Sequence, residues 1–350
     1  MNGAVSRLID ANANRAREAL RVMEDYARFV LNSPELCGQL KSLRHDLSHA
    51  LRSWAADAII HRDTPGDVGT NIKTPAETTR KDTADVVTAA GKRLGEALRT
   101  IEEFLKTASP ADAATIEAIR YRFYELERKL ALSLRPDRRF AAVKLYVLVS
   151  ESACKLPWLD AAAAALDGGA DCLQLREKAL GDRELLARAR QLVELCHRRG
   201  ALCIINDRPD IAVLAGADGV HLGQDDLPAP LARRIVANRA IIGVSTHNLD
   251  QARAAILDGA DYIGVGPIYK SPTKPRDFVP GLEYAAAVAD LPIPKVAIAG
   301  IGLENVDDVL ATGIGAIAVT AAVLGCQDVK GAARRLKEKL CGKVESMNDE

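Results

Sequence analysis

Apolar residues recur at helical spacing through residues 1 to about 132. Within the first such segment Leu20, Met23, Ala27 and Val30 fall on one face of a helix. Two later segments behave in the same way. The predicted helices are Asn14–Leu31, Glu35–Ala56 and Ala113–Leu134. The first third of the chain is therefore predicted to be an all-α domain.

This helical region contains a short internal sequence repeat. The string Glu18–Tyr26 recurs 78 residues later as Glu96–Phe104, which suggests two related helices packed about a local pseudo-twofold axis. The polar stretch His61–Lys81 between them is predicted to be a long loop. Residues 135–143, which begin with Arg-Pro-Asp-Arg-Arg, break the last helix and are predicted to form a linker. The predicted organisation is a helical domain over residues 1–134, this linker, a second domain over 144–342 and a flexible tail over 343–350.

From Lys144 onward the pattern changes to short apolar runs that alternate with amphipathic helices. The runs are Leu145–Ser150, Cys172–Lys178, Leu202–Asp207, Gly219–Gly223, Ile241–Thr246, Tyr262–Pro267, Lys295–Gly300 and Ala316–Thr320. The helices between them include Arg183–Arg199, Leu249–Asp258 and Asn305–Thr312. Continuous apolar strands with helical crossovers indicate a parallel sheet covered on both faces. Eight such units predict an α/β fold with a closed (β/α)8 TIM barrel. An open doubly wound sheet is the weaker alternative, because no strand–GxGxxG–helix unit opens this half.

The composition and net charge of the chain limit the classes of partner and the cellular compartments that can be expected for this protein. Lys+Arg and Asp+Glu number 47 each in 350 residues, so no net charge points to nucleic acid or to a membrane surface. No stretch approaches the length of a membrane span, and the first residues lack an apolar signal core. The seven cysteines are scattered without a Cys-x-x-Cys pair, which favours a reducing, cytoplasmic location.

Polar residues gather at the carboxyl ends of the predicted strands, where barrels of this kind carry their active sites. The residues at these ends are Gln174, Arg176, Lys178, Asn206, Asp207, His221, Gln224, Asp226, Ser245, His247, Ser271, Thr273, Lys274, Gly300, Val319 and Thr320. Asp207 and Asp226 follow adjacent strands and could share one Mg²⁺ ion, which favours a few hard oxygen ligands together with phosphate oxygens. Cationic side chains would hold phosphate charge, as would the backbone turns after the seventh and eighth strands.

These residues carry a resemblance to a known family. The strings QLREK, IIND, VHLGQDDLP, GVSTHN, GPIYKSPTKP and VAIAGIG, in this order between Lys144 and Leu340, resemble thiamine-phosphate synthase. The resemblance implies that a transferase joins the diphosphate ester of 4-amino-5-hydroxymethyl-2-methylpyrimidine to hydroxyethylthiazole phosphate, with Mg²⁺ as cofactor and diphosphate as the second product.

The resemblance also implies roles for individual residues. The pyrimidine diphosphate would be bound by Gln174, Leu175, Arg176, Glu177, Lys178, Asn206, Ser245 and Lys274. The thiazole phosphate would be bound by Ser271, Pro272, Thr273, Gly300, Val319 and Thr320, and the metal by Asp207 and Asp226. Arg176, Lys178, Ser245 and Lys274 are the residues expected to assist the reaction itself. The chain has Ser271-Pro272 where the family commonly has Thr-x, which keeps a hydroxyl but stiffens the loop.

The leaving group indicates the mechanism. An aminopyrimidine methylene can carry positive charge through its ring, so loss of diphosphate can precede attack by the thiazole nitrogen. The protein then has to neutralise charge on the diphosphate and hold the nucleophile in line. This scheme needs no strong general base, so His221 and His247 are interpreted as structural residues that support others.

Residues of the barrel site also have interpretations that do not involve catalysis. Taken alone, Asp207 could cap a helix, and Lys178 could be an ordinary surface cation. The joint occurrence of these residues at one end of different strands argues against both interpretations. A thiazole-phosphate sensor and a barrel that isomerises the thiazole are the rival functions, and neither accounts for Lys178, Asp207 and Asp226 together.

The helical domain resembles the module that precedes some bacterial thiamine-phosphate synthases, through DANANRAREALRVMEDYARFVL, RDTPGDVG and GKRLGEALRTIEEF. That resemblance implies phosphorylation of the pyrimidine monophosphate with ATP. The alternative is a non-catalytic module for regulation or dimerisation, the latter making the protein a homo-oligomer. The loop residues Arg62–Thr64, Asp67–Gly69 and Lys81 could form a small-molecule site, whereas His45 and His49 are interpreted as a solvated helix face.

Overall fold

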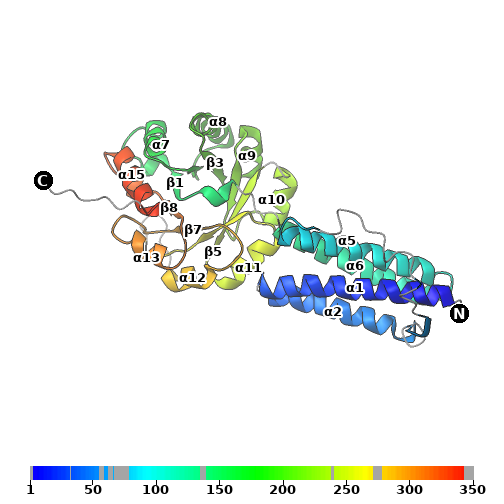
Figure 1. Ribbon diagram of the computed structural model, residues 1–350. Helices are drawn as coiled ribbons and strands as arrows, with labels where there is room; N and C mark the ends of the chain where they lie inside the picture. Colours follow the sequence, from blue (N-terminus) through cyan, green and yellow to red (C-terminus); the bar gives the residue numbers. More distant parts are fainter. Residues whose placement is uncertain are drawn as a thin grey trace. The chain divides into compact units, whose positions relative to one another are not determined.

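The chain divides into two compact units, residues 1–134 and residues 135–350. The computed structural model describes residues 3–31, 33–54, 59–61, 66, 79–134, 139–237, 240–270 and 278–342. Figure 1 shows the two units. None of the described helices is both long enough and apolar enough to cross a membrane.

In its described residues, the first unit has four long helices and a short 3₁₀ turn. The helices are α1 (Gly3–Phe29), α2 (Pro34–Ala50), α5 (Thr83–Leu105) and α6 (Pro110–Ser133), with η1 at Ile59–His61. Helix α1 packs against α2 and α5, and α6 packs against both α5 and α2 (Figure 1). The side chains of Ser33 and Asp82 cap α2 and α5 by accepting backbone N–H groups. The all-α prediction for this part of the chain is confirmed.

The predicted apolar face of the first helix is largely correct. Leu20, Met23 and Ala27 are buried, but α1 ends at Phe29, so Val30 lies beyond the helix and is only half-buried. The internal sequence repeat is accompanied by a repeat in the ion pairs. Glu24 of α1 accepts a hydrogen bond from Arg44 of α2 at 2.9 Å, and Glu102 of α5 accepts one from Arg120 of α6 at 2.7 Å. The two helices that carry the repeat, α1 and α5, therefore each contact a partner helix through an equivalent buried glutamate.

The second unit is a parallel eight-stranded barrel, closed in chain order because β1 pairs with both β2 and β8. The strands are β1 (Leu145–Val149), β2 (Cys172–Leu175), β3 (Leu202–Asn206), β4 (Gly219–Leu222), β5 (Ile241–Thr246), β6 (Tyr262–Val265), β7 (Lys295–Ile298) and β8 (Ile317–Val319). Closure excludes the open doubly wound sheet and confirms the TIM-barrel prediction.

Helices cover the outside of this barrel (Figure 1). They are α7 (Trp158–Asp167), α8 (Asp182–Arg198), α9 (Pro209–Ala215), α10 (Ala229–Val236), α11 (Leu249–Leu257), α12 (Gly281–Val288), α13 (Val306–Ala311), α14 (Ala321–Leu324) and α15 (Val329–Leu340), with 3₁₀ turns η2 (Phe140–Ala142) and η3 (Glu151–Ala153). Several strands end earlier than predicted. For example, β2 stops at Leu175 rather than Lys178, because the polar residues that follow turn onto the rim.

The barrel interior is filled mainly by alternate strand residues. These are Tyr146, Leu148, Cys172, Ile204, Ile241, Tyr262, Val296 and Ala318, joined by Ala316 just before β8 and by Phe140 and Val143 from the segment that precedes β1. The ring of Phe140 stacks on that of Tyr262 with centroids 3.6 Å apart. Because Phe140 comes just before β1, it closes the barrel at the amino ends of the strands. Part of the predicted linker thus belongs to the barrel core.

Candidate active site

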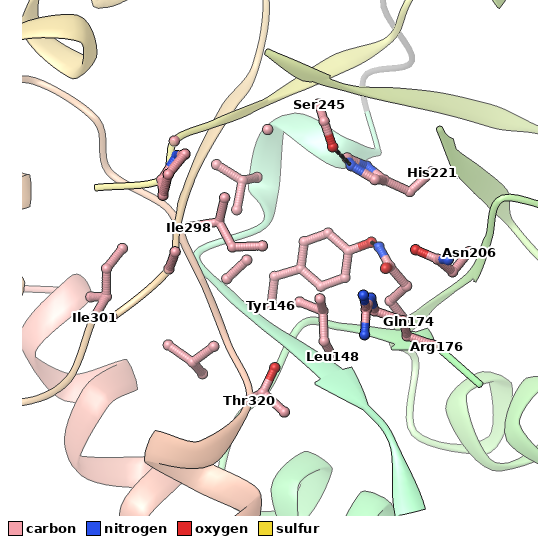
Figure 2. Close-up of a pocket in the computed structure, with 18 of the residues that line it drawn as sticks. Tyr146, Leu148, Gln174, Arg176, Asn206, His221, Ser245, Ile298, Ile301 and Thr320 are labelled. Atoms are coloured by element: carbon pink, nitrogen blue, oxygen red, sulfur yellow. Dashed lines mark hydrogen bonds between the residues drawn. The ribbon is translucent and has the colours of Figure 1, made fainter. Parts of the chain in front are cut away.

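A cavity of about 500 Å³ opens at the carboxyl ends of the barrel strands (Figure 2). Ten of the residues predicted to bind substrate or metal line it together. They are Gln174, Arg176, Lys178, Asn206, Asp207, Asp226, Ser245, Gly300, Val319 and Thr320. Below these polar groups, Leu148, Val296, Ile298 and Ala318 form an apolar floor. An apolar cavity with a few convergent polar groups is the usual form of a small-molecule site.

The other residues predicted to bind substrate fall into two groups. Leu175 is buried, and like Glu177 it does not line the cavity; Glu177 instead accepts the backbone N–H of Glu151 at 2.6 Å. A substrate contact by either residue stays a prediction. Ser271, Pro272, Thr273 and Lys274 lie outside the described residues.

Asp207 and Asp226 come from the ends of β3 and β4 and both face the cavity. Asp207 has a left-handed backbone, with φ of 62°, and its N–H donates to the His221 carbonyl at 2.8 Å. Its carboxylate lies 3.0 Å from the Lys178 ammonium. The N-cap of α9 is Arg208, and that cap lacks a side-chain hydrogen bond. The helix-cap interpretation of Asp207 therefore finds no support.

The two carboxylates influence each other's ionisation. Burial raises the pKa of Asp226, and the neighbouring Asp207 carboxylate raises it further. Burial acts in the same direction on Asp207, but hydrogen bonds with Asp226 and Lys178 and the charge of Arg176 bring its pKa below the ordinary value. Two ionised carboxylates this close repel each other, and a cation between them removes that repulsion.

The donor set suits Mg²⁺. Among the described residues no cluster of three or more His, Cys, Asp or Glu side chains is placed to hold a metal, so a closed structural metal site is not present there. Two hard carboxylates on an open rim match the protein share of a Mg²⁺ site, since this ion keeps waters and takes phosphate oxygens from its substrate. Asp226 is held in place because its carboxylate accepts the Gly223 N–H at 2.6 Å.

The turn after β7 forms the opposite side of the cavity. Ala299 and Gly300 both adopt positive φ, 84° and 66°, and a side chain at Gly300 would come within 2.7 Å of Tyr269. Asn305 fixes the turn by donating to the Gly300 carbonyl and accepting the Gly302 N–H, each at 2.9 Å. Successive backbone N–H groups in a turn can form a concave surface that binds an anion.

A buried polar chain lies beneath the rim and was not identified from the sequence. Gln174 Nε2 donates to the Tyr146 hydroxyl at 2.6 Å, and the hydroxyls of Tyr146 and Tyr262 are 3.0 Å apart. His221 continues the chain, with Nδ1 2.8 Å from the Tyr262 hydroxyl and Nε2 2.9 Å from Ser245 Oγ. A signal was available, because a tyrosine inside a barrel strand must find a hydrogen-bond partner.

Burial lowers the pKa of His221 to about 4, so the imidazole is neutral at physiological pH. A neutral imidazole has one donor and one acceptor nitrogen, which matches its two neighbours in the chain. His247 also lines the cavity, and its Nδ1 lies 2.5 Å from the Gly266 carbonyl. Both histidines thus have the supporting contacts that the sequence interpretation assigns to them.

The helical unit shows no comparable site in its described part. A cavity of about 20 Å³ lies between α1 and α2, lined in part by Asp10, Arg17 and Trp54, and it is too small for a nucleotide. His45 and His49 are exposed on α2. Arg62–Thr64 and Asp67–Gly69 lie outside the described residues, while Lys81 is exposed.

Comparisons with known proteins agree with this geometry. A family model described as thiamine monophosphate synthase matches residues 145–323, and the ThiD2 family model matches residues 7–129. A thiamine-phosphate synthase of Rhodopirellula baltica is 44% identical, covering 96% of this chain and 92% of the relative. One of Synechocystis is 41% identical, covering 96% of both chains. A solved thiamine phosphate pyrophosphorylase from Pyrococcus furiosus is 35% identical with a TM-score of 0.54, covering 59% of this chain and 98% of its own.

Proposed function

The chain belongs to the thiamine-phosphate synthase family of transferases, and from that premise we propose that its barrel joins a pyrimidine diphosphate to a thiazole phosphate. The pyrimidine is the 4-amino-2-methyl-5-(diphosphooxymethyl) compound, the acceptor is hydroxyethylthiazole phosphate, and the products are thiamine phosphate and diphosphate. The observation that carries the proposal is the meeting of Lys178, Asp207 and Asp226 at one rim above an apolar cavity.

The pyrimidine ring would occupy the apolar floor, with its diphosphate directed to the charged side of the rim. There Arg176, Lys178 and Asn206 would bind phosphate oxygens, together with Lys274. Arginine and lysine suit this task because they supply charge and several N–H donors. The thiazole phosphate would bind on the turn at Gly300 and at Val319 and Thr320, with Ser271, Pro272 and Thr273 completing that side.

Bond breaking would precede bond making. The C–O bond between the pyrimidine methylene and the diphosphate breaks, the electron pair leaves with the diphosphate, and the cationic side chains stabilise the charge that develops there. The thiazole nitrogen then forms the C–N bond to the methylene. Because the nitrogen attacks with its own lone pair, no group has to remove a proton from it.

Asp207 and Asp226 would hold Mg²⁺ in this scheme. When bound, the ion supplies positive charge to the diphosphate oxygens. Lys178 lies 3.0 Å from Asp207 and stabilises the ionised form of that carboxylate. Its positive charge therefore lies next to the site where Mg²⁺ and the diphosphate would bind.

Synthesis of thiamine phosphate from the two purified substrates, with and without EDTA, tests the proposal. We expect product with Mg²⁺ and a large loss after chelation. Binding of thiazole phosphate without product would support the sensor function instead. Conversion of the thiazole phosphate alone to an isomer would support the isomerase function.

For the helical unit we propose phosphorylation of the pyrimidine monophosphate with ATP, supported by its match to the ThiD2 family. The full chain is incubated with ATP and the monophosphate in the absence of the thiazole, and ³¹P NMR follows formation of the diphosphate. Asp207→Ala serves as the control because it disables the barrel alone. If no diphosphate forms in either protein, a non-catalytic module for regulation or self-association is the better account.

We also place the protein in a reducing, cytoplasmic compartment. All seven cysteines have free thiols, and Cys172, Cys196 and Cys203 are buried inside the barrel unit. Free thiols persist where glutathione and thioredoxin keep them reduced.

A further inference from the structure

Five polar side chains connect two walls of the cavity through the barrel interior. The chain runs from Gln174 on β2 through Tyr146 on β1 and Tyr262 on β6 to His221 on β4 and Ser245 on β5, with successive distances of 2.6, 3.0, 2.8 and 2.9 Å. Figure 2 shows Gln174 meeting Tyr146 on one side and His221 meeting Ser245 on another. Both ends of the chain line the cavity, so a single ring bound there can contact both.

The first link determines the direction of every later hydrogen bond. Gln174 Nε2 can only donate, so the Tyr146 oxygen accepts and its own proton goes to Tyr262. Tyr262 then donates to Nδ1 of His221. Because Nδ1 accepts this hydrogen bond, the ring proton is on Nε2, which donates to Ser245 Oγ. In this arrangement each tyrosine hydroxyl has one donor and one acceptor as partners, and each ring nitrogen has one partner of the correct kind.

The two ends of the chain consequently present opposite groups to a ligand. The amide of Gln174 has its NH₂ group toward Tyr146, which leaves its carbonyl oxygen as the acceptor on the other arm. Ser245 already accepts from His221, which leaves its hydroxyl proton to be donated. The cavity therefore offers an acceptor at Gln174 and a donor at Ser245.

Packing holds the central tyrosines where the chain requires them. Tyr146 and Tyr262 are 2% and 0% exposed, and the Tyr262 ring stacks on Phe140. A Cβ atom at Gly243 would lie 2.0 Å from Cζ of Tyr262, so the absence of a side chain there makes room for the ring. The hydroxyls are thus fixed by ring packing and do not depend on a bound ligand.

We propose that Tyr146, Tyr262 and His221 are positioning residues that set the hydrogen-bond polarity of Gln174 and Ser245, and thereby select a 4-aminopyrimidine diphosphate over its 4-oxo analogue. The proposal rests on the proposed function of the barrel. An exocyclic amino group donates to the Gln174 oxygen, and a ring nitrogen accepts from Ser245. A 4-oxo group would place a second acceptor against the amide oxygen, and sites built around one hydrogen-bond pattern reject the reversed pattern strongly.

Removing one hydroxyl should allow the hydrogen bonds of Gln174 and Ser245 to reverse direction. In Tyr262→Phe the ring and its stack on Phe140 remain, but Tyr146 loses its acceptor and His221 loses its donor. Tyr146 can then donate to the amide oxygen after the amide of Gln174 turns over, and the imidazole can take the other tautomer. Both ends of the chain would present the opposite groups to the cavity.

The test measures kcat/KM for the 4-amino substrate and Ki for the 4-oxo diphosphate as a competitive inhibitor, in wild type, Tyr262→Phe and Tyr146→Phe. We expect discrimination against the oxo compound to fall by at least about tenfold in both variants, through weaker use of the amino substrate and tighter binding of the analogue. Selective ¹⁵N NMR of His221 gives a second readout. We expect an Nε2–H tautomer in wild type and a changed population in Tyr262→Phe.

Tyr284→Phe is the matched control. It removes a buried hydroxyl that donates to Thr246 at 2.6 Å and that takes no part in the hydrogen-bond chain from Gln174 to Ser245. It should leave the discrimination and the His221 tautomer unchanged. An equal effect of Tyr262→Phe on both compounds, or an Nδ1–H tautomer in wild type, overturns the proposal while leaving synthase activity intact. Absence of thiamine phosphate synthesis in wild type instead overturns the proposed function, and the selectivity proposal with it. If Tyr262→Phe does not fold, Tyr146→Phe decides on the same criteria.

Discussion

Asp207 adopts a backbone conformation that few residues other than glycine accept, with φ of 62°. Left-handed backbone costs an L-residue about 1–2 kcal/mol, least for Asp and Asn, and such strain is concentrated at functional sites. Here the conformation turns the chain immediately after β3 and brings the carboxylate to Lys178 at 3.0 Å. The local cost is consistent with a residue retained for its position at the rim.

Removal of either member of this ion pair should impair the reaction far more than it impairs folding. We expect Asp207→Ala or Lys178→Ala to lower kcat/KM by roughly 10²–10³-fold, about 3–4 kcal/mol in transition-state stabilisation, because charge on the departing diphosphate loses a partner. Steady-state kinetics at saturating Mg²⁺ measures the effect. Glu304→Ala at the same cavity is the control, and near-wild-type turnover in either test variant would remove that residue from the mechanism.

The raised pKa of Asp226 predicts a metal-dependent acid limb. Burial and the Asp207 carboxylate favour its protonated form, so protons should displace Mg²⁺ at a higher pH than an ordinary carboxyl would allow. Activity should therefore fall as pH drops through the raised pKa. Increasing Mg²⁺ should move this limb to lower pH, as measured by kcat/KM profiles at several Mg²⁺ concentrations. An acid limb that stays in place, or one that still moves with Mg²⁺ in Asp226→Asn, would contradict the assignment.

Among the secondary-structure elements, three Gly-Ala-Asp turns perform the same task at the start of the strands. Each has a glycine with positive φ, at Gly169, Gly216 and Gly259, and ends in an aspartate. The carboxylates of Asp171, Asp218 and Asp261 accept backbone N–H groups of neighbouring strands at Leu145, Cys203 and Ile242, at 2.9, 2.9 and 2.7 Å. The repeated motif thus joins each helix stop to the adjacent strand.

Loss of one such carboxylate should destabilise the barrel without changing its chemistry. Asp261 has a side chain only 6% exposed and also pairs with Arg233 at 2.6 Å, so Asp261→Ala leaves a partly buried cation and a strand N–H without this partner. We expect a loss of about 3 kcal/mol in the free energy of unfolding, measured by urea denaturation. Asp160→Ala, at an exposed position of α7, should cost less than about 1 kcal/mol, and an equal effect of both changes would refute the assigned role.

For the whole molecule, the two compact units bury separate ionic and apolar groups. In the helical unit Glu102 is fully buried and contacts Arg120, Arg99 and Lys106 at 2.7, 2.8 and 3.1 Å. Burial alone would raise the pKa of Glu102, but these cations lower it below the ordinary value. A lowered carboxyl pKa stabilises the folded state above the unfolded pKa, and this contribution is lost as the medium becomes more acidic.

Separate cores predict separable effects of mutation. Glu102→Ala leaves Arg120, whose side chain is 7% exposed, without its main partner, so the helical unit should lose about 3–5 kcal/mol of stability. Thiamine phosphate synthesis by the barrel of the full chain should be retained. Calorimetry and the synthase assay measure the two effects. Glu117→Ala, which removes an exposed carboxylate 3.8 Å from the same arginine, is the control, and parallel loss of synthase activity would show that the units depend on each other.

The sequence by itself determined the architecture and most of the rim. Helical periodicity identifies the first unit and strand periodicity the second. Each periodicity shows which side chains of an element are buried on folding. Polar residues at the ends of apolar runs predicted Gln174, Lys178, Asp207, Asp226 and Ser245 as neighbours, and all five line one cavity. This inference works because parallel strands in a barrel direct all their carboxyl ends to the same mouth.

Only the tertiary structure decided which groups touch inside the barrel. Tyr146 and Tyr262 are 116 residues apart, and their contact depends on strand tilt, ring packing on Phe140 and the space at Gly243. By contrast, Leu175 and Glu177 do not line the cavity that Gln174 lines, and the alternation of side chains along a strand is enough to predict this. Periodicity records burial on a single element, whereas hydrogen-bond partners across a closed barrel are selected by three-dimensional distance and orientation, which no local pattern encodes.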